Sequence, residues 1–166
     1  MAVRIPLAVS TPSEREVRVI RVFDAPKGLV FDAFVKPDLV RRWLLGREGR
    51  SMPVCDIDFR EGGSFRYVWR EDATGTDFGL SGHYREILRP DRIVHTELFD
   101  DYAVYGDSLV TTLFAESAGK TTVTLNVLYP SRESRDGTLA SGMTDGLGQS
   151  YDRLDALLVE AGEETR

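Results

Sequence analysis

The side chains with the most specific chemistry in this 166-residue chain are its two histidines and its single cysteine. His95 stands two residues before Glu97 in a segment with the composition of a strand. A histidine beside a carboxylate can transfer protons in a cavity that excludes water. Because Val94 and Leu98 have the opposite parity and look like the inward-facing residues, we expect His95 and Glu97 to face solvent.

Cys55 would act as a nucleophile only with a histidine beside it. It lies in the segment PVCDIDF, between two expected core positions, where a free cysteine is most often a small buried apolar side chain. His83 and Glu86 belong to another predicted strand, so the potential metal ligands are not clustered in the sequence. We expect no metal site and no cofactor, since phosphate-binding loops, dinucleotide fingerprints and His-Glu-x-x-His motifs are also missing.

Composition narrows the class of partner. The formal net charge of −6 argues against a surface for nucleic acid or for an anionic membrane, because both need a basic footprint. With one cysteine no internal disulfide can form, and no apolar run is long enough for a signal peptide or a membrane span. We expect a cytoplasmic protein with a polar lead-in at 1–15, one domain at 16–161 and a short tail at 162–166.

The elements that must position these side chains follow from periodicity and turn residues. Residues 16–26 form a predicted strand, and two short predicted helices begin at Pro26 and Pro37, the second ending at Gly46. About six strands follow, with a strong hairpin signal at the sequence SAGK, and a long helix is expected from about 137 to 160. Consecutive strands at hairpin spacing indicate an antiparallel sheet that only the last helix can cover, so the predicted class is α+β.

The last predicted helix is weakened where it should pack best. Its apolar positions lie on one face at intervals of three and four residues, yet three glycines interrupt its first half, at Gly142, Gly146 and Gly148. Each glycine inside a helix costs about 1 kcal/mol relative to alanine. Their small size either lets the sheet approach the helix closely or leaves a void.

An aromatic stripe is the most suggestive feature of the predicted strands. Phe65, Tyr67 and Trp69 alternate along one of them, and further rings occur on its neighbours at Tyr84, Phe114 and Tyr129. Such side chains suit a pocket for a flat or amphipathic ligand, and they equally suit a filled core. The sequence leaves both interpretations open.

The order of elements resembles the START-like (SRPBCC, helix-grip) superfamily, and within it the bacterial proteins grouped with the activator of heat-shock-protein-ninety ATPase. The resemblance covers roughly residues 17–160. Its motifs are RVFDAPKGLVFDAFVKPDLVRRW, EGGSFRYVW, LSGHYREILRPDRIVHT, GKTTVTLNVLYP and GMTDGLGQSYDRLDALL. It implies a strongly curved antiparallel sheet of about six to seven strands that grips the C-terminal helix and encloses a cavity for a small molecule.

The resemblance also implies a function and a set of residues around that cavity. We expect binding of an apolar or amphipathic small molecule, with a cyclase- or hydrolase-like enzyme as the alternative. A chaperone-partner role is a further alternative, but the eukaryotic activators carry an N-terminal domain that this chain is too short to hold. A homodimer is expected from the family. Relatives usually carry tryptophan where this chain has Leu147. The expected lining residues are Trp43, Phe65, Tyr67, Trp69, Tyr84, Phe114, Leu125, Val127, Met143 and Leu147.

Overall fold

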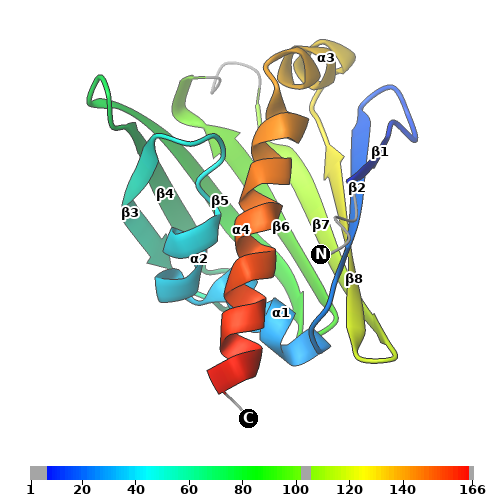
Figure 1. The fold of residues 1–166 in the computed structure, drawn as a ribbon. Helices are drawn as coiled ribbons and strands as arrows, with labels where there is room; N and C mark the ends of the chain where they lie inside the picture. Colours follow the sequence, from blue (N-terminus) through cyan, green and yellow to red (C-terminus); the bar gives the residue numbers. More distant parts are fainter. Residues whose placement is uncertain (1–6, 102–105, 165–166) are drawn as a thin grey trace.

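The computed structural model of the protein describes residues 7–101 and 106–164. It contains eight strands in one antiparallel sheet, in the order β1-β2-β8-β7-β6-β5-β4-β3, with a long helix, α4, crossing the inner face of that sheet (Figure 1). The elements are β1 (Ala8–Ser10), β2 (Glu16–Phe23), α1 (Lys27–Val35), α2 (Pro37–Trp43), β3 (Arg50–Ile57), β4 (Ser64–Glu71), β5 (Thr76–Leu88), β6 (Arg92–Phe99), β7 (Ser108–Ser117), β8 (Lys120–Leu128), α3 (Arg132–Ala140) and α4 (Met143–Glu164). The predicted α+β helix-grip class is confirmed.

The sheet has one strand more than the sequence predicts. β1 lies in the segment expected to be a polar lead-in and pairs with β2 at the sheet edge. β2 in turn pairs with β8 along its full length, so the first long strand and the last one are neighbours. The predicted hairpin at SAGK joins β7 to β8, where Ser117 pairs with Lys120 and both turn residues have positive φ, 53° at Ala118 and 77° at Gly119. That turn matches the right-handed twist of the strands.

The C-terminal helix differs from its predicted extent. The expected single helix from about 137 to 160 is wrong, because the chain forms α3, breaks, and then forms α4. Gly142 has φ of 85°, a conformation that glycine adopts without strain and that ends α3. The start of α3 is fixed by Ser131, whose side chain accepts a hydrogen bond from the Ser134 amide at 3.0 Å.

The other two glycines of the predicted helix, Gly146 and Gly148, lie against neighbouring chain segments and not against the sheet. A Cβ at Gly146 would lie 3.9 Å from the Gly46 Cα, in the connection between α2 and β3. A Cβ at Gly148 would lie only 3.1 Å from Leu7 Cδ1, in the N-terminal segment. The Gly46 amide donates to Ser150 Oγ at 2.8 Å, which holds that connection against α4. Gly148 therefore marks close packing on one side of α4, whereas a Cβ at Gly146 would make only an ordinary contact.

An aromatic cluster fills the interior where α1 and α2 meet α4. Phe34 and Tyr151 contact Trp43 with ring centroids 4.9 and 5.9 Å apart, and Phe34 contacts Phe114 at 5.2 Å. Trp43 is 2% exposed and its Nε1 donates to the Ala33 carbonyl at 2.8 Å. Trp43 thus staples α2 to α1 inside a filled core. The members of this cluster are Phe23, Phe31, Phe34, Trp43, Phe114 and Tyr151.

A buried ion cluster joins α4 to the sheet beside that aromatic cluster. Arg21 projects from β2 toward the helix and is only 3% exposed. Its guanidinium donates to Asp152 at 2.9 Å and to Asp155, which lie three residues apart on one face of α4. Burial raises the pKa of Asp155 above its ordinary value, although the positive charge of Arg21 acts in the opposite direction. A buried guanidinium needs such partners, because a charge without them is costly to take out of water.

We predict that Asp152→Asn combined with Asp155→Asn lowers the free energy of unfolding by about 2–3 kcal/mol, because it leaves the Arg21 charge buried without a counter-charge. Urea denaturation of the purified variant measures the change. Asp77→Asn is the matched control, since Asp77 pairs with Arg70 at 2.7 Å on the surface, where ion pairs contribute little to stability. Equal effects of the two changes would contradict the structural role of Arg21.

Candidate functional site

The inner face of β4 and β5 carries a continuous wall of aromatic rings. Phe65 contacts Tyr67 and Tyr84 with centroids 4.9 and 5.5 Å apart, and Tyr67 contacts Trp69 at 5.8 Å. Gly82 pairs with Phe65, and a Cβ at this position would lie 2.0 Å from the Thr96 carbonyl oxygen and 2.3 Å from the Phe65 ring, so only glycine fits beside that ring. Trp69 is fixed by a hydrogen bond from Nε1 to the Leu44 carbonyl at 2.7 Å. The predicted aromatic stripe is therefore one rigid surface.

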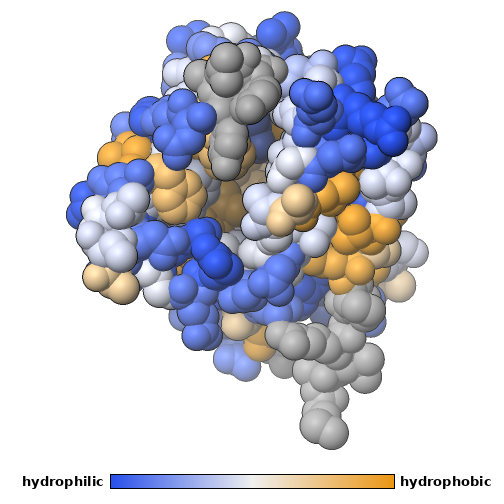
Figure 2. Space-filling model, turned by 90° about the horizontal axis from the view of Figure 1, so that it is seen from above, coloured by the Kyte–Doolittle hydropathy of each residue, from blue (hydrophilic) through white to orange (hydrophobic). Residues whose placement is uncertain are grey.

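Opposite this wall, several apolar side chains face inward without being fully buried. Leu125 has the same parity as Val123 and Val127 on β8, which are 0% and 4% exposed, yet Leu125 itself is only partly buried. Met143 and Leu147 continue the buried stripe of α4 toward its N-terminus and are also only partly buried. Figure 2 shows a hollow in this end of the molecule with hydrophobic colour in its depth. We call this hollow, between the N-terminal turns of α4 and the inner face of the sheet, the inner cavity. Leu125, Met143 and Leu147 are partly buried apolar residues of these elements.

His95 and Glu97 face the inner cavity, so the expectation that they face solvent is wrong. His95 pairs with Tyr84 on one side and with Val110 on the other, and both partners lie on the inner face of the sheet. Side chains of directly paired residues lie on the same face. Glu97, two residues further along β6, shares that face.

The pair has a defined geometry. Nε2 of His95 lies 3.1 Å from Oε1 of Glu97, and because an ionised carboxylate can only accept, we assign the proton to Nε2. The His95 ring meets Phe65 edge to face at 5.3 Å. Its Nδ1 is buried and has no partner among the described residues. The two side chains are 16% and 28% exposed, so the carboxylate remains accessible from the cavity.

The negative charge of Glu97 acts on tyrosines of three other elements. Burial raises the pKa of Tyr67, Tyr129 and Tyr151, and the negative charge of Glu97 raises each of them further. Burial likewise raises the pKa of Tyr84, the ring neighbour of His95. Tyrosines of β4, α4 and the segment after β8 are thus within electrostatic range of one carboxylate. Chemically, the group can accept a hydrogen bond or a proton from a molecule held against the aromatic wall.

The sequence of β6 contains one signal for the inward orientation of His95 and Glu97, and other residues of the same strand point to the opposite orientation. Ile93 and Phe99 have the same parity as His95 and Glu97, and Ile93 pairs with the inward-facing Thr112. Val94 and Thr96 suggest the opposite face because they are apolar or small, and both are in fact buried. The β-bulge between Tyr84 and Glu86 shifts the register beside Val94, and the Thr96 hydroxyl accepts from the His83 amide at 3.0 Å. Because Val94 and Thr96 are buried on the outer face of β6, their composition does not reveal that His95 and Glu97 face inward.

The other candidate residues do not assemble into a catalytic or metal site. Cys55 is 3% exposed and burial raises the pKa of its thiol, as expected for a structural cysteine. His83 is exposed on the outer face, where it pairs with Ser64. Within residues 7–101 and 106–164, no three His, Cys, Asp or Glu side chains gather as a metal site. Of the expected lining residues, Trp43 and Phe114 belong to the filled aromatic cluster.

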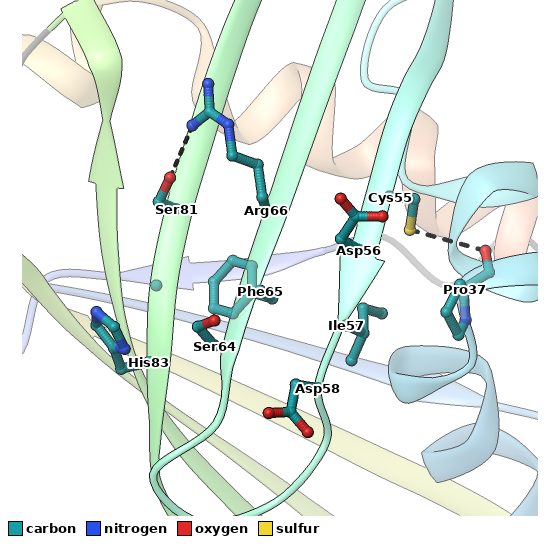
Figure 3. A pocket seen from close by; sticks show the side chains of 11 residues that line it. Pro37, Cys55, Asp56, Ile57, Asp58, Ser64, Phe65, Arg66, Ser81 and His83 are labelled. Atoms are coloured by element: carbon teal, nitrogen blue, oxygen red, sulfur yellow. Dashed lines mark hydrogen bonds between the residues drawn. The ribbon is translucent and has the colours of Figure 1, made fainter.

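A shallow groove lies over β3, β4 and β5, and it is lined by polar residues such as Arg66, Ser81 and His83 and also by Phe65 (Figure 3). Its central cation, Arg66, donates to Ser81 at 2.7 Å and to both carboxylate oxygens of Asp100. The hydrogen-bonding capacity of Arg66 is thus directed to the protein itself. Phe65 is shared between this groove and the aromatic wall, whereas Tyr67, Trp69 and Tyr84 do not line the groove, so the inner cavity is the better candidate site.

Comparisons with known proteins agree with this architecture. The family model described as Activator of Hsp90 ATPase homolog 1-like protein matches residues 24–159. A solved structure from Rhodobacter sphaeroides is 30% identical, with a TM-score of 0.85, over 92% of this chain and 98% of that one. Another from Chromobacterium violaceum is 27% identical, with a TM-score of 0.74, over 86% of this chain and 96% of that one. No curated protein matches.

A more distant structure shows how widely the fold is shared. The AHSA1-like protein from Aeromonas hydrophila is 18% identical, with a TM-score of 0.67, over 84% of this chain and 93% of that one. Among the described residues, no helix is both long and apolar enough to cross a membrane.

We predict that Tyr67, Tyr84, Tyr129 and Tyr151 stay protonated in the folded protein at pH values where an exposed tyrosine ionises. Each titrates near its ordinary pKa of about 10 in the unfolded chain. Above that pH the unfolded state binds fewer protons than the folded state, so the free energy of unfolding decreases as the pH rises. The slope is about 1.4 kcal/mol per pH unit for each such tyrosine.

Tyrosinate absorbance and circular dichroism, followed together in an alkaline titration, test this. The ionisation of these four residues should coincide with unfolding, and Tyr151→Phe should reduce the slope by the share of one tyrosine. Ionisation of all four while the circular dichroism signal is still native would contradict the prediction.

Proposed function

The chain belongs to the Activator of Hsp90 ATPase homolog 1-like family, and we propose that it binds an apolar or amphipathic small molecule in the inner cavity. The observation that supports this most is the incomplete burial of inward-facing apolar residues. Leu125 lies between two buried valines, and Met143 and Leu147 extend a stripe whose later members are buried. A bound apolar molecule would cover the surface that these residues leave accessible.

The shape of the surrounding interior supports the same proposal. Rigid aromatic rings with a few polar groups beside them are typical of small-molecule sites. Further rings lie beside this wall: Trp69 stacks on Phe78 with centroids 5.3 Å apart, and Phe99, on the inner face, is 36% exposed. The guanidinium of Arg50 lies 4.8 Å from the centroid of the Phe78 ring and is tied to Glu71 at 2.8 Å. A flat apolar ligand would enter past these rings.

We predict that Leu147→Trp abolishes ligand binding while the protein stays folded, because the larger ring occupies the cavity. Val159→Trp is the matched control, since Val159 is 58% exposed on the same helix. Native mass spectrometry of the purified proteins, followed by denaturation and identification of released compounds, measures occupancy. Thermal shift with fatty acids, flavonoids and polyketide-like compounds extends the test. Equal occupancy of both variants would contradict the proposed site.

A second candidate function is enzymatic, in the cyclase- or hydrolase-like sense, and the inward orientation of His95 and Glu97 favours it. A base on the inner face could remove a proton from a ligand lying against the aromatic wall. Mass spectrometry of compounds incubated with the protein would then show loss of water for a cyclisation, or gain of water for a hydrolysis. Glu97→Gln should leave the compounds unchanged. Recovery of unaltered ligand from the wild-type protein would reject this candidate.

A further inference from the structure

We propose that Glu97 and His95 form the polar anchor of the inner cavity and select a flat aromatic ligand that presents a hydroxyl group, a phenol. The inference rests on the proposed binding function and adds the chemical class of the ligand. Its starting point is the hydrogen bond of 3.1 Å between the two side chains on the inner face of β6.

The pair has no evident structural purpose. His95 and Glu97 stand on the same strand, two residues apart, so their hydrogen bond links no two elements of the fold. The cluster of Arg21 with Asp152 and Asp155, by contrast, joins β2 to α4. A carboxylate facing an apolar interior is costly unless it gains hydrogen bonds. Within the described part of the chain, His95 is the one hydrogen-bonding partner of the Glu97 carboxylate, so accepting capacity remains on Oε2.

The charges around the inner cavity determine which polar group of a ligand can bind beside Glu97. Glu97 is an acceptor, and the buried Nδ1 of His95 is a further acceptor when Nε2 carries the proton. Arg21 is the one fully buried cation among the described residues, and two aspartates already neutralise it. An anionic ligand would therefore meet a negative charge without a compensating cation. A neutral hydrogen-bond donor matches the site.

The aromatic wall indicates which kind of ligand would carry the hydrogen-bond donor. The His95 ring lies edge-on to Phe65, and Tyr84 and Tyr67 continue the same aromatic surface toward Trp69. Offset or edge-to-face contacts with such rings favour an aromatic ligand beyond its buried area. A hydroxyl on that ring would donate to Glu97, while the ring itself packs between the wall and Leu147.

Matched naphthalene derivatives test the proposal by fluorescence titration of the purified protein. We expect 2-naphthol to bind about tenfold or more tightly than 2-methoxynaphthalene, because only the former donates a hydrogen bond to a charged acceptor. Excited 2-naphthol also transfers its proton to a nearby base, so the bound probe should emit as naphtholate. 2-Naphthoate should bind more weakly than 2-naphthol.

Variants assign these effects to the pair. Glu97→Leu should remove the preference for 2-naphthol and the naphtholate emission, while binding of 2-methoxynaphthalene is kept. Glu97→Gln should reduce the preference, and it provides the measurement if the leucine variant fails to fold. Glu86→Gln is the control, because Glu86 is a half-buried carboxylate of β5 that pairs with Arg92 of β6.

The outcomes separate this inference from the binding function. Equal affinity of the wild-type protein for 2-naphthol and 2-methoxynaphthalene would overturn the anchor and leave the cavity intact. Tighter binding of 2-naphthylmethylammonium than of 2-naphthol would overturn the phenol in favour of a cation. Failure of every probe to bind would contradict the cavity and the anchor together.

Discussion

The buried guanidinium of Arg21 is the constraint on which the arrangement of helix and sheet depends. A sheet with one apolar face could accept an apolar helix at many rotations and offsets, because hydrophobic contact is not directional. A charge buried beneath the helix removes that freedom, since only one setting of α4 brings Asp152 and Asp155 to it. With the helix fixed there, Tyr151 fits against Phe23 and Trp43 in the aromatic cluster. The same setting fixes where Leu147 and Met143, one and two turns earlier, face the sheet.

The interior is thereby divided into two parts with different roles. Around α1 and α2 the rings interlock and leave little accessible surface, which provides the stability of the fold. Toward the N-terminal turns of α4 the inward side chains are only partly buried, and polar groups appear among them. Under the proposed function, the rigid half would hold the geometry of the half that receives the ligand.

Much of the fold could be predicted from the sequence, since it follows from local signals that no tertiary contact reverses. The Pro26 and Pro37 helix starts, the turn at Ala118 and Gly119 and the alternation along β4 are of this kind. The orientation of His95 and Glu97 was not predictable in the same way. It depends on the pairing of β6 with β7 and on a bulge in β5, and the only local signal, the parity of Ile93 and Phe99, is contradicted by Val94 and Thr96. The break at Gly142 was visible as a glycine, but the apolar stripe continuing past it favoured one helix.

The neighbouring positions of β2 and β8 also determine when the fold can form. Residues 16–23 have their long pairing partner only after residues 120–128 have been synthesised, and Leu7 packs against Gly148, later still. Until then β2 lacks its main pairing partner, β8, and Arg21 lacks its counter-charges on α4. Such long-range closure makes folding slow relative to local structure. On the ribosome, this domain therefore remains open until almost its last helix has emerged.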